Sequence, residues 1–290
     1  AISYYEGNEA MPREHGVELM NPLSGDLGIM RQRLLYGGLE TVAHNINRKA
    51  ADLRLYEFGN VYRRDPKAQS TSEKPLAPFS EEMRLALWMT GRDRLPSWKE
   101  PCCPASVFDL KAVVLNILES LGIPSGAVQM TQRADSLYSV SLSLDTRDGK
   151  HLGDLGVLAS ALLRRFDIRQ EVYYAELSWP VVLKLALKSK SQFTDLPRTQ
   201  PVVRDLALLL DRAVSFAEVE AVVRSSEKRL LKGVSLFDVY EGDKLPEGKK
   251  SYAISITLQD NERTLQDKQI EAVMKKVVTN LQKQLGAELR

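Results

Sequence analysis

Three stretches near the end of the chain alternate between apolar and polar residues, a pattern that is typical of half-buried strands. They cover residues 202–211, about 233–241 and 250–259. Helical signals lie between and after these strands. Ser215 and Glu218 form a capping box that predicts the start of one helix, and Thr264 and Asp267 resemble the cap of another. The apolar positions of the second helix step by three or four residues: Ile270, Val273, Val277, Leu281 and Leu285.

The last residues, 287–290, are expected to add a short strand to this pattern. The resulting order is strand, helix, strand, strand, helix, strand, which predicts a ferredoxin-like βαββαβ domain. In that arrangement two helices cover one face of the sheet and leave the other face open.

Side chains alternate between the two faces of a strand, so the pattern assigns each residue to a face. We expect one set to point toward the helices: Phe237, Val239, Tyr252, Ile254, Ile256 and Leu258. The other set lies on the open face: Asp238, Tyr240, Ser251, Ala253 and Ser255, joined by Asp205 and Arg290. One aromatic ring beside small hydrogen-bonding residues is the arrangement that a stacked nucleic-acid base needs. The same pattern also fits a solvated sheet face with an incidental tyrosine.

The longer N-terminal part mixes helical and strand patterns. Residues 29–49 predict an amphipathic helix, and "LRLYEFGNVYR" at 53–63 predicts the strand that follows it. The other predicted elements are a strand at 80–92, a helix at 109–121, and strands at 136–144 and 172–178. Together they predict an antiparallel α+β domain. The helix predicted at 29–49 carries an apolar stripe that fits either contact with a partner subunit or the core of its own domain: Leu35, Leu39, Val42 and Ile46.

A polar, basic stretch closed by two prolines, residues 188–201, predicts a connection between two domains. We place the first domain at 1–187, the linker at 188–194 and the second domain at 195–290. The opening "AISYYEGNEAMP" has no Met and no helix or strand signal, and we expect it to be the cut end of a longer protein.

Composition narrows the class of protein. The hydrophobic fraction of 43% and charged fraction of 27% are those of an ordinary globular chain, and the longest apolar runs are too short to span a bilayer. A net charge of +2 argues against a large basic surface but leaves room for a local basic patch. Three scattered histidines lack metal-ligand spacing, and the adjacent Cys102 and Cys103 favour a reducing cytoplasm over a disulfide.

Three runs of the sequence are specific enough to suggest a family. They are "NPLSGDLGIMRQRLLYGGLETVAHNINRKAADLRLYEFGNVY" at 21–62, "FDLKAVVLNILESLGI" at 108–123, and "RDLALLL" with "LFDVYEGDKLPEGKKSYAISITLQDNERTLQDKQI" within 204–270. With these runs the chain resembles the bacterial phenylalanine–tRNA ligase beta subunit over essentially all of its 290 residues.

The resemblance implies that the chain is the C-terminal part of that subunit. Residues 1–187 would be an inactive module related to class II synthetase domains that supports subunit assembly, and residues 195–290 would be a ferredoxin-fold anticodon-binding domain. The family works in the cytoplasm as a heterotetramer of two alpha and two beta chains, which attaches phenylalanine to tRNA(Phe) with ATP and magnesium. The implied partners are the alpha subunit, a second beta subunit and tRNA(Phe), with no membrane.

The resemblance also implies which residues act. The aminoacylation site lies on alpha, and the editing site and metal ligands of beta lie upstream, so no catalytic residue, metal ligand or cofactor is expected here. Four residues match the anticodon contacts of the family. Asp238 and Tyr240 match its D-x-Y motif, Ser251 matches the serine of its K-S pair, and Arg290 matches its L-R terminus. Tyr240 would stack on the first anticodon base.

Two other activities fit the residues less well. "YRRD" at 62–65 is similar to the ATP-gripping motif of class II sites, but Asp replaces Glu and no glycine-rich motif supplies a second arginine, so ATP binding is not expected. A regulatory module of the ACT type shares the ferredoxin-like topology. Such modules resemble one another in a glycine-containing turn after the first strand, whereas "DRAVS" at 211–215 has no glycine.

Overall fold

The computed structural model describes residues 11–24, 27–94, 97–99, 101–189 and 195–290. The first ten residues, which we expected to be the cut end of a longer protein, lie outside the described residues. Most of the predicted linker does too. The chain divides into two compact units, Ala1–Ser191 and Gln192–Arg290, each with its own core.

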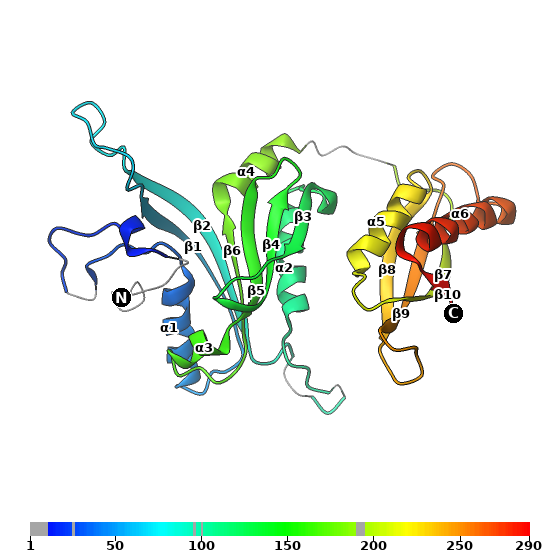
Figure 1. The fold of residues 1–290 in the computed structure, drawn as a ribbon, viewed down its shortest axis with the longest axis horizontal. Coiled ribbons are helices and arrows are strands. Elements are labelled where there is room, and N and C mark those ends of the chain that lie inside the picture. The colour runs from blue at the N-terminus through cyan, green and yellow to red at the C-terminus, as the bar shows by residue number, and fades with distance from the viewer. Residues whose placement is uncertain (1–10, 25–26, 95–96, 100, 190–194) are drawn as a thin grey trace. The chain divides into compact units, whose positions relative to one another are not determined.

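A six-stranded sheet with the order β1-β2-β6-β5-β4-β3 forms the centre of the first unit (Figure 1). Every neighbouring pair in it is antiparallel. Its strands are β1 (Leu53–Arg64), β2 (Phe79–Thr90), β3 (Val128–Gln132), β4 (Tyr138–Thr146), β5 (His151–Leu158) and β6 (Val172–Ser178). The predicted antiparallel α+β class is confirmed.

Helices cover both faces of this sheet, in agreement with the view in Figure 1. They are α1 (Leu35–Ile46), α2 (Val107–Ser120), α3 (Ser160–Arg164) and α4 (Trp179–Lys188), with short 3-10 turns at Arg13–His15 and Ser125–Ala127. α1 and α3 pack in one hydrophobic cluster with Trp88 and Tyr174, whereas α2 and α4 pack in another with Leu87 and Leu177. Because both faces are covered, β6 is buried at every position, which explains why its sequence "VYYAELS" does not alternate.

The helix predicted at 29–49 is shorter than expected, since α1 spans Leu35–Ile46. The preceding segment bonds to β1 instead: Arg31 accepts from the Tyr62 amide at 2.9 Å and donates its Nε to the Asn60 carbonyl at 2.9 Å. The Arg31 carbonyl, which a helix starting at residue 29 would pair with the Leu35 amide, is bonded to β1 instead. The helix ends before Lys49, whose positive φ of 67° breaks the helical geometry.

The apolar stripe of α1 belongs to the core of its own unit. Leu35, Leu39 and Val42 are fully buried beneath the helix, and Ile46 packs beside them. Leu35, Leu39 and Val42 are therefore not accessible to a partner subunit, whereas Ile46 is only partly buried.

Several elements were not anticipated from the sequence, namely β3, β5, α3 and α4. β5 reads "HLGDLGVL", and its two glycines mask the strand signal. Both glycines are required by close approach of neighbouring strands, because a Cβ at Gly153 would overlap the Glu176 carbonyl and one at Gly156 would overlap the Val140 carbonyl.

The second unit has the predicted ferredoxin-like order. Its elements are β7 (Val202–Asp211), α5 (Phe216–Ser226), β8 (Leu231–Tyr240), β9 (Lys249–Leu258), α6 (Asp267–Leu285) and β10 (Glu288–Leu289). The strands form an antiparallel sheet in the order β10-β7-β9-β8. α5 and α6 bury Val219, Val223 and Val277 against one face of the sheet, and Asn280 of α6 donates to Ser226 of α5 at 2.9 Å.

The expected faces of β9 are confirmed, since Tyr252, Ile254, Ile256 and Leu258 are all buried under the helices. The expectation for Phe237 is wrong. A β-bulge between Leu236 and Asp238 shifts the register, so that Leu236 pairs with Ile254 on the helix side and Phe237 is left 59% exposed. Val239 pairs with Tyr252 as expected but lies on the edge strand, where it stays half exposed.

The cap of α6 also differs from the prediction. Gln266 is the N-cap residue, and its backbone amide donates to the Gln269 side chain at 3.1 Å in a capping box. The predicted Thr264 and Asp267 pair does not cap this helix.

Candidate nucleic-acid interface

The open face of the second sheet contains two adjacent rows of residues that the strand register sets side by side. The first row runs Asp238, Ala253, Ala207 across β8, β9 and β7. Arg290 extends this row, because its backbone amide donates to the Ala207 carbonyl at 2.9 Å. An acidic side chain and a basic side chain therefore lie at opposite ends of a row whose two central members have only methyl groups.

The second row contains the aromatic ring. Tyr240 pairs with Ser251 on β9, and Ser251 pairs with Leu209 on β7. Gly242 lies against the ring, since a Cβ there would overlap the phenol. The ring is half-buried, which keeps it in one place on the sheet instead of free in solvent.

A cation lies over this ring. The guanidinium carbon of Arg290 is 5.6 Å from the ring centroid of Tyr240, a cation–π distance that links the two rows. The contact orients both side chains before any ligand arrives. A flat base that stacks on the same side of the ring must displace the guanidinium or insert beneath it.

The structure thus brings all four sequence-predicted residues to one surface. Asp238 and Arg290 are exposed and Tyr240 is half exposed, but Ser251 is only 6% exposed because it lies at the centre of its row. A ligand reaches the Ser251 hydroxyl only if a neighbouring side chain shifts. A third row adds polar atoms, with Ser255 donating to Asp205.

Phe237 is an aromatic residue on this strand that the sequence pattern assigned to the core. The bulge exposes it next to Asp238. Strict alternation cannot reveal a bulge. A bulge depends on how the strand pairs with its neighbour, and the sequence of the strand itself carries no mark of that pairing.

The first unit contains a different group of charged residues around a cavity of about 160 Å³. Arg63 of the "YRRD" run lines it together with Arg33, Arg84 and Glu176. Glu176 is buried and accepts from the Leu34 amide at 3.3 Å and from the Tyr174 hydroxyl at 2.9 Å. Glu176 therefore has hydrogen-bond partners within the unit, and Arg84 pairs with Glu82 at 2.8 Å.

His151 lies at the same cavity and joins two carboxylates. Its Nδ1 is 3.0 Å from Asp145 and its Nε2 is 3.2 Å from Asp154. The hydrogen bond to Asp154 raises the pKa of His151, against partial burial and with further help from Asp145. Across the part of the chain that the structure describes, no cluster of His, Cys, Asp and Glu is arranged to hold a metal ion. None of the helices described is both long and apolar enough to cross a membrane.

Comparisons with known proteins agree with this architecture. Residues 3–179 match the model of the phenylalanyl-tRNA synthetase beta chain CLM domain, and residues 197–290 match that of the ferredoxin-fold anticodon-binding domain. The chain is 51% identical over 290 residues to the phenylalanine–tRNA ligase beta subunit of Porphyromonas gingivalis, with 100% of this chain and 35% of that protein covered. It is 48% identical over 288 residues to the same subunit of Bacteroides fragilis, with 99% and 35% covered.

A solved structure of a pyrrolysyl-tRNA synthetase from Desulfitobacterium hafniense is also similar, at 16% identity and a TM-score of 0.41, over 58% of this chain and 54% of that chain. That similarity is too low to bear on function.

The two matched domains define the chain as part of an aminoacyl-tRNA synthetase. More specifically, it belongs to the phenylalanyl-tRNA synthetase beta chain family, and it spans about a third of the length of its curated relatives.

Proposed function

We propose that this chain is the C-terminal part of a phenylalanine–tRNA ligase beta subunit, with residues 1–187 serving subunit assembly and residues 195–290 binding the anticodon of tRNA(Phe). The whole enzyme would use ATP and magnesium to attach phenylalanine, whereas this part would supply no catalytic residue. The observation that carries the proposal is the open face, on which Asp238, Tyr240 and Arg290 lie around small central residues.

The chemistry of the face fits an exposed RNA base. The ring of Tyr240 offers a stacking platform, and a base–aromatic stack contributes about 1–3 kcal/mol. Asp238 accepts hydrogen bonds but repels phosphate, so its partner is a base edge with amino or imino donors. Arg290 can bind a phosphate or a base edge once it leaves the ring. Ser251 completes the proposed site by being small, since a larger side chain in its buried position would push the ring out of place.

Binding of a tRNA(Phe) anticodon stem-loop at matched salt tests this function. Tyr240→Ala should weaken binding by about 1–3 kcal/mol, because the stack is lost. Tyr240→Phe should retain most of the affinity, since stacking needs the ring and not the hydroxyl. Equal affinities of the wild type and Tyr240→Ala would mean that Tyr240 does not stack on a base and that the open face is an ordinary solvated surface.

The assembly role has a separate support in the first unit. β1 is an edge strand of the sheet, and it exposes Tyr56 (72%) and Phe58 (47%). Phe58 packs edge-to-face on Trp179 with ring centroids 4.7 Å apart, so the exposed rings continue one of the two cores out to the surface. The alpha subunit of an alpha2–beta2 heterotetramer is the partner that we assign to this aromatic patch.

Co-expression with an alpha subunit tests this assignment. Tyr56→Glu should abolish the complex in a size measurement while the chain alone keeps its melting temperature, because Tyr56 is mostly exposed. Asn116→Glu, at an exposed position of α2, is a control for the added charge. Retained assembly by Tyr56→Glu would exclude the patch. We place the complex in the cytoplasm, in keeping with the free, exposed thiols of Cys102 and Cys103.

A further inference from the structure

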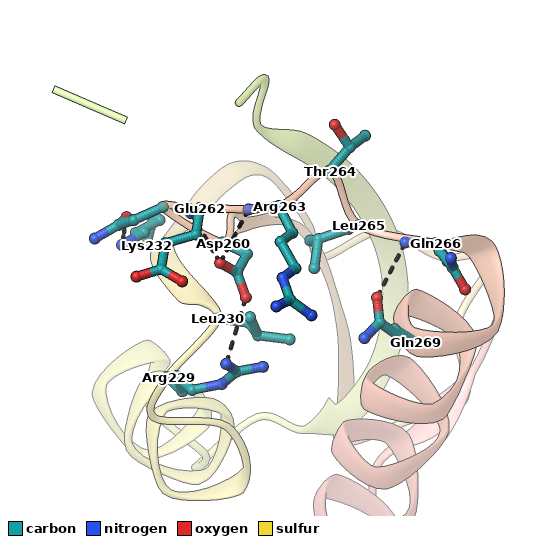
Figure 2. A pocket seen from close by; sticks show the side chains of 11 residues that line it. Arg229, Leu230, Lys232, Asp260, Glu262, Arg263, Thr264, Leu265, Gln266 and Gln269 are labelled. Carbon is teal, nitrogen blue, oxygen red and sulfur yellow. Dashed lines mark hydrogen bonds and ion pairs between the residues drawn. The ribbon is translucent and has the colours of Figure 1, made fainter. Parts of the chain in front are cut away.

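The R-T-L run at 263–265 is one of the family-specific features of the sequence, and the open face does not use it. These residues lie in the loop between β9 and α6, where they line a cavity of about 620 Å³ (Figure 2). The beginning of β8 and the first turn of α6 form the rest of its wall. The loop therefore forms a cavity on the same domain that is separate from the residues of the open face.

Three cationic side chains line this cavity: Arg229, Lys232 and Arg263. One of its two carboxylates is already engaged. Asp260 accepts from the backbone amides of Glu262 at 3.0 Å and Arg263 at 3.4 Å, and it pairs with Arg229 at 3.4 Å. The backbone bond from Glu262, with that from Arg263, lowers the pKa of Asp260, so this carboxylate holds the loop in shape.

Arg263 is the side chain available to a ligand. Its guanidinium extends into the middle of the cavity in Figure 2, and it bonds to none of the side chains that the structure describes. Lys232 is held in place by a 2.9 Å bond to Asn261. Glu262 lies at the rim with its carboxylate exposed, where it weakens attraction for an anion.

The position of the cavity on β8 connects it to the open face. Lys232 and Tyr240 are eight residues apart on this strand, which corresponds to at most about 26 Å at 3.3 Å per residue, because bulges shorten the strand. At the spacing of about 3.4 Å per nucleotide along one strand of a DNA duplex, the two points are up to roughly eight nucleotides apart. We propose that this cavity binds a backbone phosphate in the stem of the RNA whose anticodon base stacks on Tyr240. The proposal rests on the function assigned above.

The salt dependence of RNA binding to the whole chain tests the inference. A phosphate contact contributes about 0.7–0.9 to the slope of log K against log salt, so Arg263→Gln should reduce the slope by about that amount. Lys283→Gln, an exposed change in the last turn of α6, is the matched control and should leave the slope unchanged. Glu262→Gln should tighten binding at low salt, a gain that loss of loop structure would not produce.

Two further measurements distinguish failure of the cavity proposal from failure of the proposed anticodon function. A loop-only RNA of seven nucleotides lacks the stem phosphate, so Arg263→Gln and the wild type should bind it equally. If Tyr240→Ala weakens binding but Arg263→Gln leaves the slope for the stem-loop unchanged, the second site is wrong and the first stands. If Tyr240→Ala has no effect, the proposed function fails instead. Amide shifts at 260–266 caused by inorganic phosphate alone, with an unchanged RNA slope, would make the cavity a free-phosphate site and overturn the inference.

Discussion

Asp238 is the residue of the proposed interface that we expect to affect specificity among RNA bases. Its carboxylate is exposed at one end of a row that ends in Arg290, and it can only accept hydrogen bonds. Asp238→Ala should therefore reduce the difference in affinity among stem-loops that differ at one anticodon base, by about 1–3 kcal/mol. Titrating the four stem-loops against the wild type and the variant measures this difference. An unchanged spread would show that Asp238 faces solvent and not a base.

His151 gives the first unit a pH dependence. Its pKa is raised in the folded chain, first by the hydrogen bond to Asp154, so its stabilising contribution is fully present below its unfolded pKa of about 6.5. The contribution is lost as pH rises through the higher folded pKa. The free energy of unfolding of the wild type should therefore fall, relative to His151→Gln, between pH 6.5 and the folded pKa. Denaturant titrations across neutral pH measure the difference, and parallel curves for the two proteins would contradict it.

At the scale of the element, α1 contains two adjacent glycines with opposite roles. A Cβ at Gly38 would overlap the indole of Trp88, whereas one at Gly37 would meet nothing within 4 Å. Gly38→Ala should destabilise the chain by about 1–3 kcal/mol through overpacking. Gly37→Ala should stabilise it by about 0.4–1 kcal/mol, because alanine restricts the unfolded chain and favours helix. Denaturant unfolding of both variants tests the pair, and equal effects would mean that the helix does not pack closely on Trp88.

The elements that sequence predicts well are those whose signals are local. α5 begins at its capping box, and β7 and β9 alternate as half-buried strands do. The errors arise where tertiary contacts decide. The start of α1 depends on backbone bonds to β1, the glycines of β5 depend on neighbouring carbonyls, and the bulge at Phe237 depends on pairing with β9. Three of the four candidate site residues are accessible as the pattern predicts, but the burial of Ser251 depends on neighbours in space.

At the scale of the whole molecule, each unit has a complete core, and the charged cavity of the first unit has the wrong properties for a nucleotide. About 160 Å³ is below the range of roughly 300–1,000 Å³ that is usual for sites that hold larger ligands. Its lining combines three arginines with Glu176 and Asp154, and these two carboxylates offset much of the positive charge that would attract a triphosphate. We therefore expect no phenylalanine-dependent ATP–pyrophosphate exchange by residues 1–290 alone, although Arg63 lies at the cavity. The same assay after reconstitution with an alpha subunit is the positive control. Robust exchange by the pure chain, lost in Arg63→Ala, would show instead that this module retains a working site.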